Sequence, residues 1–282
     1  MKELDGRVAV ITGAASGIGR ALADECAARG MRVVVADVDG ARIEEVATEL
    51  RSRGAQVVGV PTDVTDPAQV ERLADRTSSE FGDPQLLCLN AGVAAGGVAW
   101  ELDERAWRWV IDVNLWGLIH GVRAFLPRMV DEEEGHVLVT ASIGGLIGSP
   151  GMGAYSASKH AAIGLAESLR EDLRLAGSAV GVTVLCPGFT RTRMNDSARS
   201  WPDALGAPPD GGLAPGHPRL REAFLARMTD AAEPVDVAAA ALQAVQAREF
   251  WAVTDREIGP RLAAHLAPVL HGPPCPEGAE PW

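Results

Sequence analysis

The hydrophobic residues of this chain gather in seven short runs, which cover residues 8–12, 32–37, 56–61, 85–90, 136–142, 181–186 and 250–254. Within a run, valine and leucine follow one another with little polar alternation, as is typical of parallel strands covered on both faces. Between the runs, apolar residues recur at helical spacing over 19–28, 40–53, 66–80, 104–130, 153–175 and 234–248. This alternation predicts an α/β, doubly wound fold: a seven-stranded, mostly parallel sheet with right-handed crossovers and helices on both faces.

The pattern indicates one domain. The 282 residues would allow one large domain or two small ones, but we find no second core, internal repeat or low-complexity tract. We therefore expect a single domain over 1–260. The segment 193–233, rich in Pro, Gly and Trp around a short helical stretch at 220–228, is typical of a substrate-binding lid, with a plain surface loop as the alternative. For 261–282 we expect an extension with a helix at 261–270 and a disordered tail.

Composition narrows the possible functions. The chain has 26 basic and 38 acidic residues, a formal charge of −12, which argues against nucleic acid or an anionic membrane surface as a partner. No apolar run is long enough to span a membrane, and the amino terminus enters a strand pattern without a signal peptide, so we expect a cytoplasmic protein. The four cysteines and six histidines show no metal-ligand spacing, so we expect no metal site.

Tyr155 is the only tyrosine of the chain, and Lys2 and Lys159 are its only lysines. Tyr155 and Lys159 lie four positions apart in a predicted helix, so the phenol and the ammonium share one helix face. A lysine offers a compact charge with a shiftable pKa, whereas an arginine would stay permanently charged. The alternative is a packed tyrosine beside a solvated lysine, and the rarity of both residues argues against it.

A glycine-rich turn follows the first predicted strand and opens a helix at residues 12–19. Gly13, Gly17 and Gly19 allow a tight turn and close approach of a ligand, and the helix start offers free N–H groups to a pyrophosphate. The second strand ends at Asp37, whose carboxylate would accept hydrogen bonds from ribose hydroxyls and repel a 2′-phosphate, which favours NAD over NADP. The alternative for Asp37 is a loop or cap residue beside Asp39.

Further polar residues fall at the ends of later strands, where ligands of such sheets bind. Asp63 and Val64 follow the third strand and could border the adenine, and the segment 90–92 (Asn-Ala-Gly) ends the fourth. Ser142 closes the fifth strand. Asn114 interrupts an apolar helical stretch, and a buried amide there needs a hydrogen-bonding partner.

Taken in order, these motifs resemble the short-chain dehydrogenase/reductase family, in its compact single-domain branch with a Rossmann-type fold. The matching motifs are TGAASGIG at 12–19, DV at 63–64, NAG at 90–92, Asn114, Ser142, YSASK at 155–159 and PG at 187–188. The resemblance is close over 6–193 and holds in outline over 234–254. It does not cover the lid or the tail.

The resemblance implies hydride transfer between the nicotinamide C4 and a carbinol or carbonyl carbon. Tyr155 would be the general acid/base, Ser142 would bind the substrate oxygen, Lys159 would bind the nicotinamide ribose and lower the tyrosine pKa, and Asn114 would hold a relay water. It also implies dinucleotide contacts at Gly13, Ser16, Gly17, Ile18, Gly19, Asp37, Asp63, Val64, Asn90, Ala91, Gly92, Tyr155, Lys159, Pro187, Gly188, Thr190 and Thr192. Substrate contacts would come from Ser142, Tyr155 and Met194. Thr190 departs from the family pattern, which has Val or Ile at this position.

The sequence therefore predicts an NAD-dependent oxidoreductase that interconverts a secondary alcohol and its ketone. The apolar side chains of 193–233 favour a hydrophobic substrate, unless they only anchor the loop. Three alternatives remain: an NADPH-dependent ketone reductase, a catalytically idle dinucleotide-binding module, and a sugar-nucleotide epimerase or dehydratase, which fits the glycine spacing poorly. By resemblance we also expect a homodimer or homotetramer.

Overall fold

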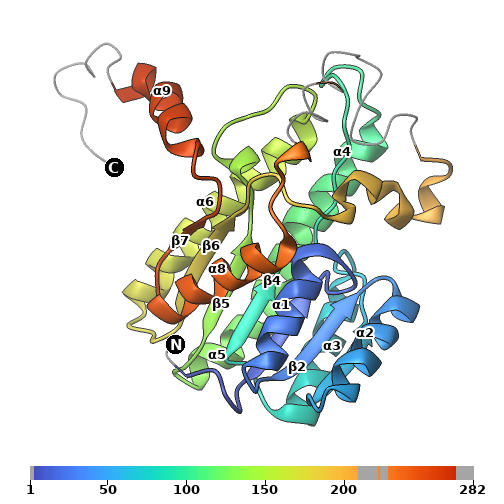
Figure 1. Ribbon diagram of the computed structural model, residues 1–282, viewed down its shortest axis with the longest axis vertical. Helices are drawn as coiled ribbons and strands as arrows, with labels where there is room; N and C mark the ends of the chain where they lie inside the picture. Colours follow the sequence, from blue (N-terminus) through green and yellow to red (C-terminus); the bar gives the residue numbers. More distant parts are fainter. Residues whose placement is uncertain (1–2, 209–221, 223–227, 271–282) are drawn as a thin grey trace.

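The computed structural model describes residues 3–208, 222 and 228–270, and its centre is a sheet of seven parallel strands (Figure 1). The strand order is β3-β2-β1-β4-β5-β6-β7. The strands are β1 (Val8–Thr12), β2 (Arg32–Asp37), β3 (Val57–Pro61), β4 (Leu86–Leu89), β5 (His136–Thr140), β6 (Gly181–Cys186) and β7 (Trp251–Val253). All seven predicted strands are confirmed, and the sheet is parallel throughout rather than mostly parallel.

Helices cover both faces of the sheet, which explains the uninterrupted apolar character of the strands. One face packs against α1 (Gly17–Ala28), α2 (Gly40–Ser52) and α8 (Pro234–Ala247). The other packs against α3 (Pro67–Phe81), α5 (Gly117–Asp131) and α6 (Gly153–Leu175). Figure 1 shows α1 and α8 in front of the sheet. Successive side chains of β1 point to opposite faces of the sheet: Ala9 and Ile11 pack in the core on the α1 side, and Val10 packs in the core on the α5 side.

The predicted helix over 104–130 is wrong as a single helix. The structure divides it into α4 (Glu104–Ile111), a π-helical turn (Asp112–Trp116) and α5. The turn carries the buried side chain of Asn114, whose Oδ1 accepts from the Val93 N–H at 2.8 Å and whose Nδ2 donates to the Val93 carbonyl at 3.0 Å. One extra residue per turn hardly alters the hydrophobic period, so the sequence pattern does not register it.

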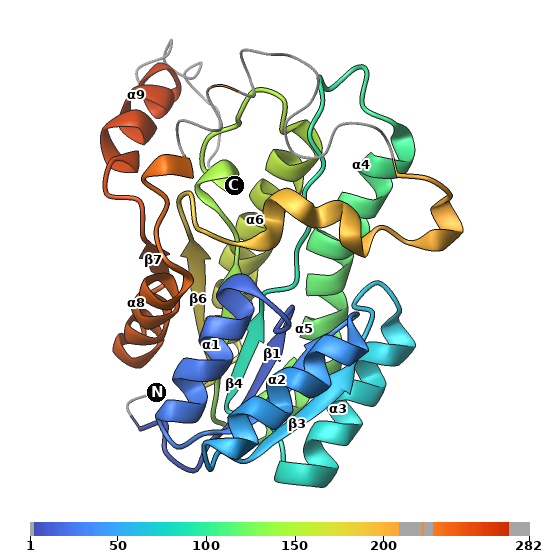
Figure 2. The same cartoon turned by 45° about the vertical axis from the view of Figure 1, so that its right-hand side comes forward.

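The last described helix, α9 (Ile258–Leu270), begins three residues before the predicted start at 261. Figures 1 and 2 show it standing apart from the helices that cover the sheet. Most of the predicted stretch at 220–228, and the tail after 270, lie outside the described residues.

The sheet topology fixes where a ligand can bind. The chain order runs outward in both directions from the β1–β4 pair, so the connections after β1 and β4 diverge to opposite sides. Such a switch point leaves a crevice at the carboxyl ends of the strands.

Candidate active site

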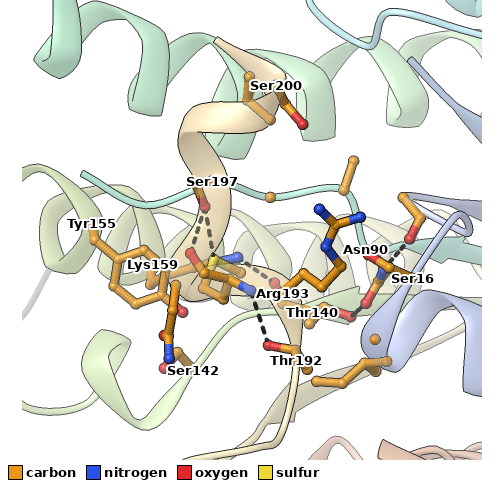
Figure 3. A pocket seen from close by; sticks show the side chains of 18 of the residues that line it. Ser16, Asn90, Thr140, Ser142, Tyr155, Lys159, Thr192, Arg193, Ser197 and Ser200 are labelled. Atoms are coloured by element: carbon orange, nitrogen blue, oxygen red, sulfur yellow. Dashed lines mark hydrogen bonds between the residues drawn. The ribbon is translucent and has the colours of Figure 1, made fainter. Parts of the chain in front are cut away.

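A cavity of about 900 Å³ lies along this carboxyl edge. It brings together the residues predicted for the site, except Gly19 and Asn114: Gly13, Ser16, Gly17, Ile18, Asp37, Asp63, Val64, Asn90, Ala91, Gly92, Ser142, Tyr155, Lys159, Pro187, Gly188, Thr190, Thr192 and Met194. Figure 3 shows Ser142, Tyr155 and Lys159 at one end, and Ser16 and Asn90 at the other. We call these the catalytic end and the adenosine end, after the roles that the resemblance implies for them.

The catalytic end is built by α6 and by the turn after β5. Tyr155 and Lys159 lie one helical turn apart, with the Lys159 ammonium 5.7 Å from the centre of the Tyr155 ring. Lys159 Nζ donates to the carbonyl oxygen of Thr140 at 2.8 Å. Ser142 Oγ accepts from the Gly144 N–H at 3.0 Å, and a Cβ placed on Gly144 would lie 3.3 Å from the Tyr155 ring and 3.5 Å from Ser142 Oγ. Phenol and hydroxyl therefore border the same small space.

Burial controls the protonation of both groups. It lowers the pKa of Lys159 to about 8, and it raises the pKa of Tyr155 above its usual 10. A hydrogen bond with Ser142 acts on the Tyr155 pKa in the opposite direction but does not outweigh burial. The resemblance implies that Lys159 lowers the tyrosine pKa. In the structure desolvation is the largest effect on the phenol and raises its pKa, and the Lys159 ammonium donates to Thr140.

The glycine-rich turn at the adenosine end fits a dinucleotide. Gly13 and Gly17 adopt φ angles of +69° and +57°, which favour glycine. A Cβ on Gly19 would lie 2.2 Å from the Gly13 carbonyl oxygen, so Gly19 serves the turn from behind rather than lining the cavity. Ser16 precedes α1 without capping it through its side chain, so the first N–H groups of the helix remain available to a phosphate.

Asp37 closes β2 beside this turn and faces the cavity. Its carboxylate accepts from the backbone N–H groups of Ala15 and Asp39, each at 3.1 Å. Two backbone donors hold the carboxylate in place and leave it acceptor capacity for a ribose hydroxyl.

Two predicted residues mainly hold the scaffold together. Asn90 donates through Nδ2 to the Thr12 carbonyl at 3.0 Å and accepts from the Thr140 hydroxyl at 3.2 Å, so it joins the ends of β1, β4 and β5. The Asn114 side chain lies behind the cavity wall, where it also donates to Ser158 Oγ at 2.9 Å. Its amide is thus engaged by the protein, as expected for a buried polar group.

The segment 193–206, which we call the strap, crosses the cavity. The sequence predicted a substrate-binding lid here but none of its individual contacts. It contains the 3₁₀ turns Arg193–Ser200 and Asp203–Leu205. Ser197 accepts from the Ala94 N–H at 3.1 Å, and Arg199 donates to Ser16 Oγ at 3.3 Å. Figure 3 shows Ser197 on the strap between the two ends. The only sequence signal was the insertion itself, since neither residue belongs to a motif.

Residues 7–203 match the family described as short chain dehydrogenase. The chain belongs to the short-chain dehydrogenase/reductase family. Members of this family are oxidoreductases that act on hydroxyl and ketone groups with a nicotinamide dinucleotide. The fold and the glycine turn agree with that assignment.

Three relatives illustrate the match. The chain is 47% identical over 194 residues to 1-deoxy-11-beta-hydroxypentalenate dehydrogenase of Streptomyces exfoliatus, covering 68% of this chain and 70% of the relative. It is 31% identical over 280 residues to the CLA biosynthesis dehydrogenase/reductase of Lactiplantibacillus plantarum, covering 96% and 98%. A crystal structure of a short-chain dehydrogenase/reductase from Burkholderia phymatum in complex with NAD superposes with a TM-score of 0.91 at 40% identity, covering 100% and 99%.

Two features are absent from the described part of the chain. Within residues 3–208, 222 and 228–270, no three or more His, Cys, Asp or Glu side chains group so that they could hold a metal ion. Over the same residues, no helix combines the length and the apolar character needed to cross a membrane.

Proposed function

We propose that this short-chain dehydrogenase/reductase interconverts a secondary alcohol and its ketone with NAD as the preferred cofactor. The observation that carries the proposal is the assembly of Ser142, Tyr155 and Lys159 at one end of a cavity whose other end is the glycine turn. The phenol and the glycine-rich turn thus line the same cavity, which supports a proton donor beside a dinucleotide site.

Ser142, Tyr155 and Lys159 have different roles in this proposal. Ser142 and Tyr155 hold the substrate oxygen between two hydroxyl groups, and Tyr155 takes up or releases its proton. Lys159 lies on the same side of α6 and is held by Thr140, where its charge favours the ionised phenol. When bound, the nicotinamide supplies the hydride chemistry.

The preference for NAD rests on Asp37. Its carboxylate lines the cavity beside the turn, and Asp39 lies two residues further along the same wall. Two carboxylates would disfavour an additional phosphate on the ribose. The NAD complex of the Burkholderia phymatum relative agrees with this preference.

The substrate is proposed to be apolar around its reacting carbon. The cavity wall includes the apolar side chains of Trp109, Val113, Phe189, Met194 and Trp201. Trp109 and Trp201 contact each other edge to face, with ring centres 5.1 Å apart, so they form a fixed aromatic surface. The hydroxypentalenate dehydrogenase relatives support a hydroxylated carbon skeleton over a free sugar.

The test is a parallel titration of the purified protein with NADH and NADPH, followed by nicotinamide fluorescence and then by turnover of apolar secondary alcohols with NAD⁺. We expect tight NADH binding, weaker NADPH binding and oxidation of at least one alcohol of the panel. Tighter binding of NADPH would reverse the cofactor assignment and favour a ketone reductase. Binding without any turnover would favour the idle module.

A further inference from the structure

We propose that Arg199 of the strap binds phosphate charge of the dinucleotide opposite Ser16, so that one side chain both joins the strap to the glycine turn and contributes to cofactor affinity. The inference rests on the proposed dinucleotide function. No motif of the chain contains Arg199, and its role follows from where the strap carries it.

The strap aims the guanidinium group at the glycine turn. Arg199 Nη1 donates to the carbonyl oxygens of Arg193 and Asp196, at 2.8 and 2.9 Å, which fixes the group on the strap. Nη2 reaches across the cavity to Ser16 Oγ at 3.3 Å. One guanidinium therefore spans from the strap to the residue that precedes α1, and Nε and the remaining Nη2 proton are left to donate to a ligand.

The charge of Arg199 is not neutralised by a close partner. Among the described residues no carboxylate forms an ion pair with it, whereas Arg193 pairs with Asp196 at 2.6 Å and Arg191 with Glu233 at 3.1 Å. Burial and repulsion by Arg193 lower the pKa of Arg199, and attraction by Asp196, Asp37 and Asp39 opposes them. The side chain thus lies in the field of the carboxylates at the adenosine end without contacting them.

A phosphate placed there would meet two kinds of donor. The N–H groups and the dipole at the start of α1 come from one side, and the planar guanidinium comes from the other. Two phosphate groups could take this position: the pyrophosphate, which NADH and NADPH share, or the 2′-phosphate of NADPH, for which Arg199 would offset the repulsion by Asp37. The pyrophosphate and the 2′-phosphate present the same phosphate chemistry to Arg199, and binding measurements with NADH and NADPH distinguish between them.

The experiment compares the dissociation constants of NADH and NADPH for the wild type, Arg199→Gln and Arg199→Lys, at low and at high salt. The matched control is Arg105→Gln. Arg105 Nη1 donates to the Leu205 carbonyl at 2.7 Å, so this variant loosens the far end of the strap without removing charge from the cavity.

We expect Arg199→Gln to weaken binding roughly ten-fold at low salt and less at high salt, because a charge-assisted contact is screened. Arg199→Lys should recover part of the loss, and Arg105→Gln should bind within about two-fold of the wild type. Equal losses for NADH and NADPH assign the contact to the pyrophosphate, and a loss confined to NADPH assigns it to the 2′-phosphate.

Two results would overturn the inference. One is unchanged binding of both dinucleotides by Arg199→Gln. The other is a loss that is independent of salt, is not restored by lysine and is matched by Arg105→Gln, because that pattern shows a strap effect alone. Failure of the wild type to bind either dinucleotide would instead refute the proposed function.

Discussion

The two ends of the cavity hold their polar groups in opposite ways. At the catalytic end the groups are withdrawn from water: the Lys159 residue is 2% exposed and Ser142 is 8% exposed. At the adenosine end Asp37 is half-buried, and Asp39 and Arg199 are exposed. One end therefore works by desolvation of single groups, and the other by several solvated charges and backbone donors.

This difference predicts where substitutions should have large and small effects. Desolvation magnifies the interaction of a charge with its surroundings and shifts its pKa. Solvated charges are screened, so each contributes modestly to binding. Substitutions at the catalytic end should change the reaction or the stability strongly, and those at the adenosine end should change affinities by smaller factors.

The largest effect is expected for Tyr155→Phe. Loss of the phenolic proton should reduce turnover by about 1,000-fold or more, while the dissociation constant of NADH stays within about three-fold of the wild type. In the wild type, alcohol oxidation should rise with pH because the buried phenol, whose pKa is raised, must act as the ionised base. Steady-state kinetics and fluorescence titration measure the two quantities. Wild-type turnover by the variant would contradict the assignment of the acid/base.

The second effect concerns stability, through Lys159→Met. Because the pKa of Lys159 is about 8 in the fold against a usual value near 10.4, the cationic form costs about 3 kcal/mol at pH 7. This cost is complete below pH 8 and is relieved as pH rises toward 10.5, since the native state loses the proton first. The cofactor-free variant should therefore be more stable than the wild type at pH 7, by somewhat less than that amount because the Thr140 carbonyl loses its donor.

Urea unfolding at pH 7 and pH 9.5 measures this difference, which should shrink at the higher pH. Tyr155→Phe is the control from the same end of the cavity. The Tyr155 phenol of the wild type stays protonated over this pH range, so the stability difference between this variant and the wild type should not change. If the Lys159→Met variant were less stable than the wild type at pH 7, the buried lysine would not lower the free energy of unfolding, and the prediction would be wrong.

The smallest of the three effects belongs to the adenosine end. Asp37→Ser should shift the ratio of NADPH to NADH affinity by about ten-fold toward NADPH, because one solvated repulsion is removed. The matched control is Asp39→Ser, since Asp39 lines the same wall but caps α2 by accepting from the Arg42 N–H at 3.0 Å. A ratio that moves equally in both variants would show a general charge effect and not a contact of Asp37.

Much of this arrangement could be predicted because its signals are local. The spacing of Tyr155 and Lys159 within one helix, and the glycines within one turn, bring groups together over a few residues. Buried parallel strands can be recognised in the sequence as apolar runs, and the last residues of those runs lie at one edge of the sheet. The meeting of Ser142, Tyr155 and Lys159 in one cavity could therefore be predicted from the sequence, and their catalytic roles stay predictions.

The parts that escaped prediction depend on contacts between distant segments. Arg199 and Ser16 are 183 positions apart, and surface arginines are too numerous for one to be singled out by type. The π-helical turn at Asn114 is stabilised by bonds to Val93 and Ser158, which no period within the helix reveals. The burial that raises the pKa of Tyr155 likewise follows from packing rather than from spacing.

The strap has a practical meaning for anyone who would redesign the enzyme. Its Trp201 belongs to the substrate wall, its Ser197 fastens it to the loop after β4, and its Arg199 reaches the glycine turn. If both proposals hold, substrate range and cofactor affinity depend on the same short peptide. Transplanting this peptide from another enzyme would exchange both traits at once, and a library that varies the aromatic surface alone should leave Ser197 and Arg199 untouched.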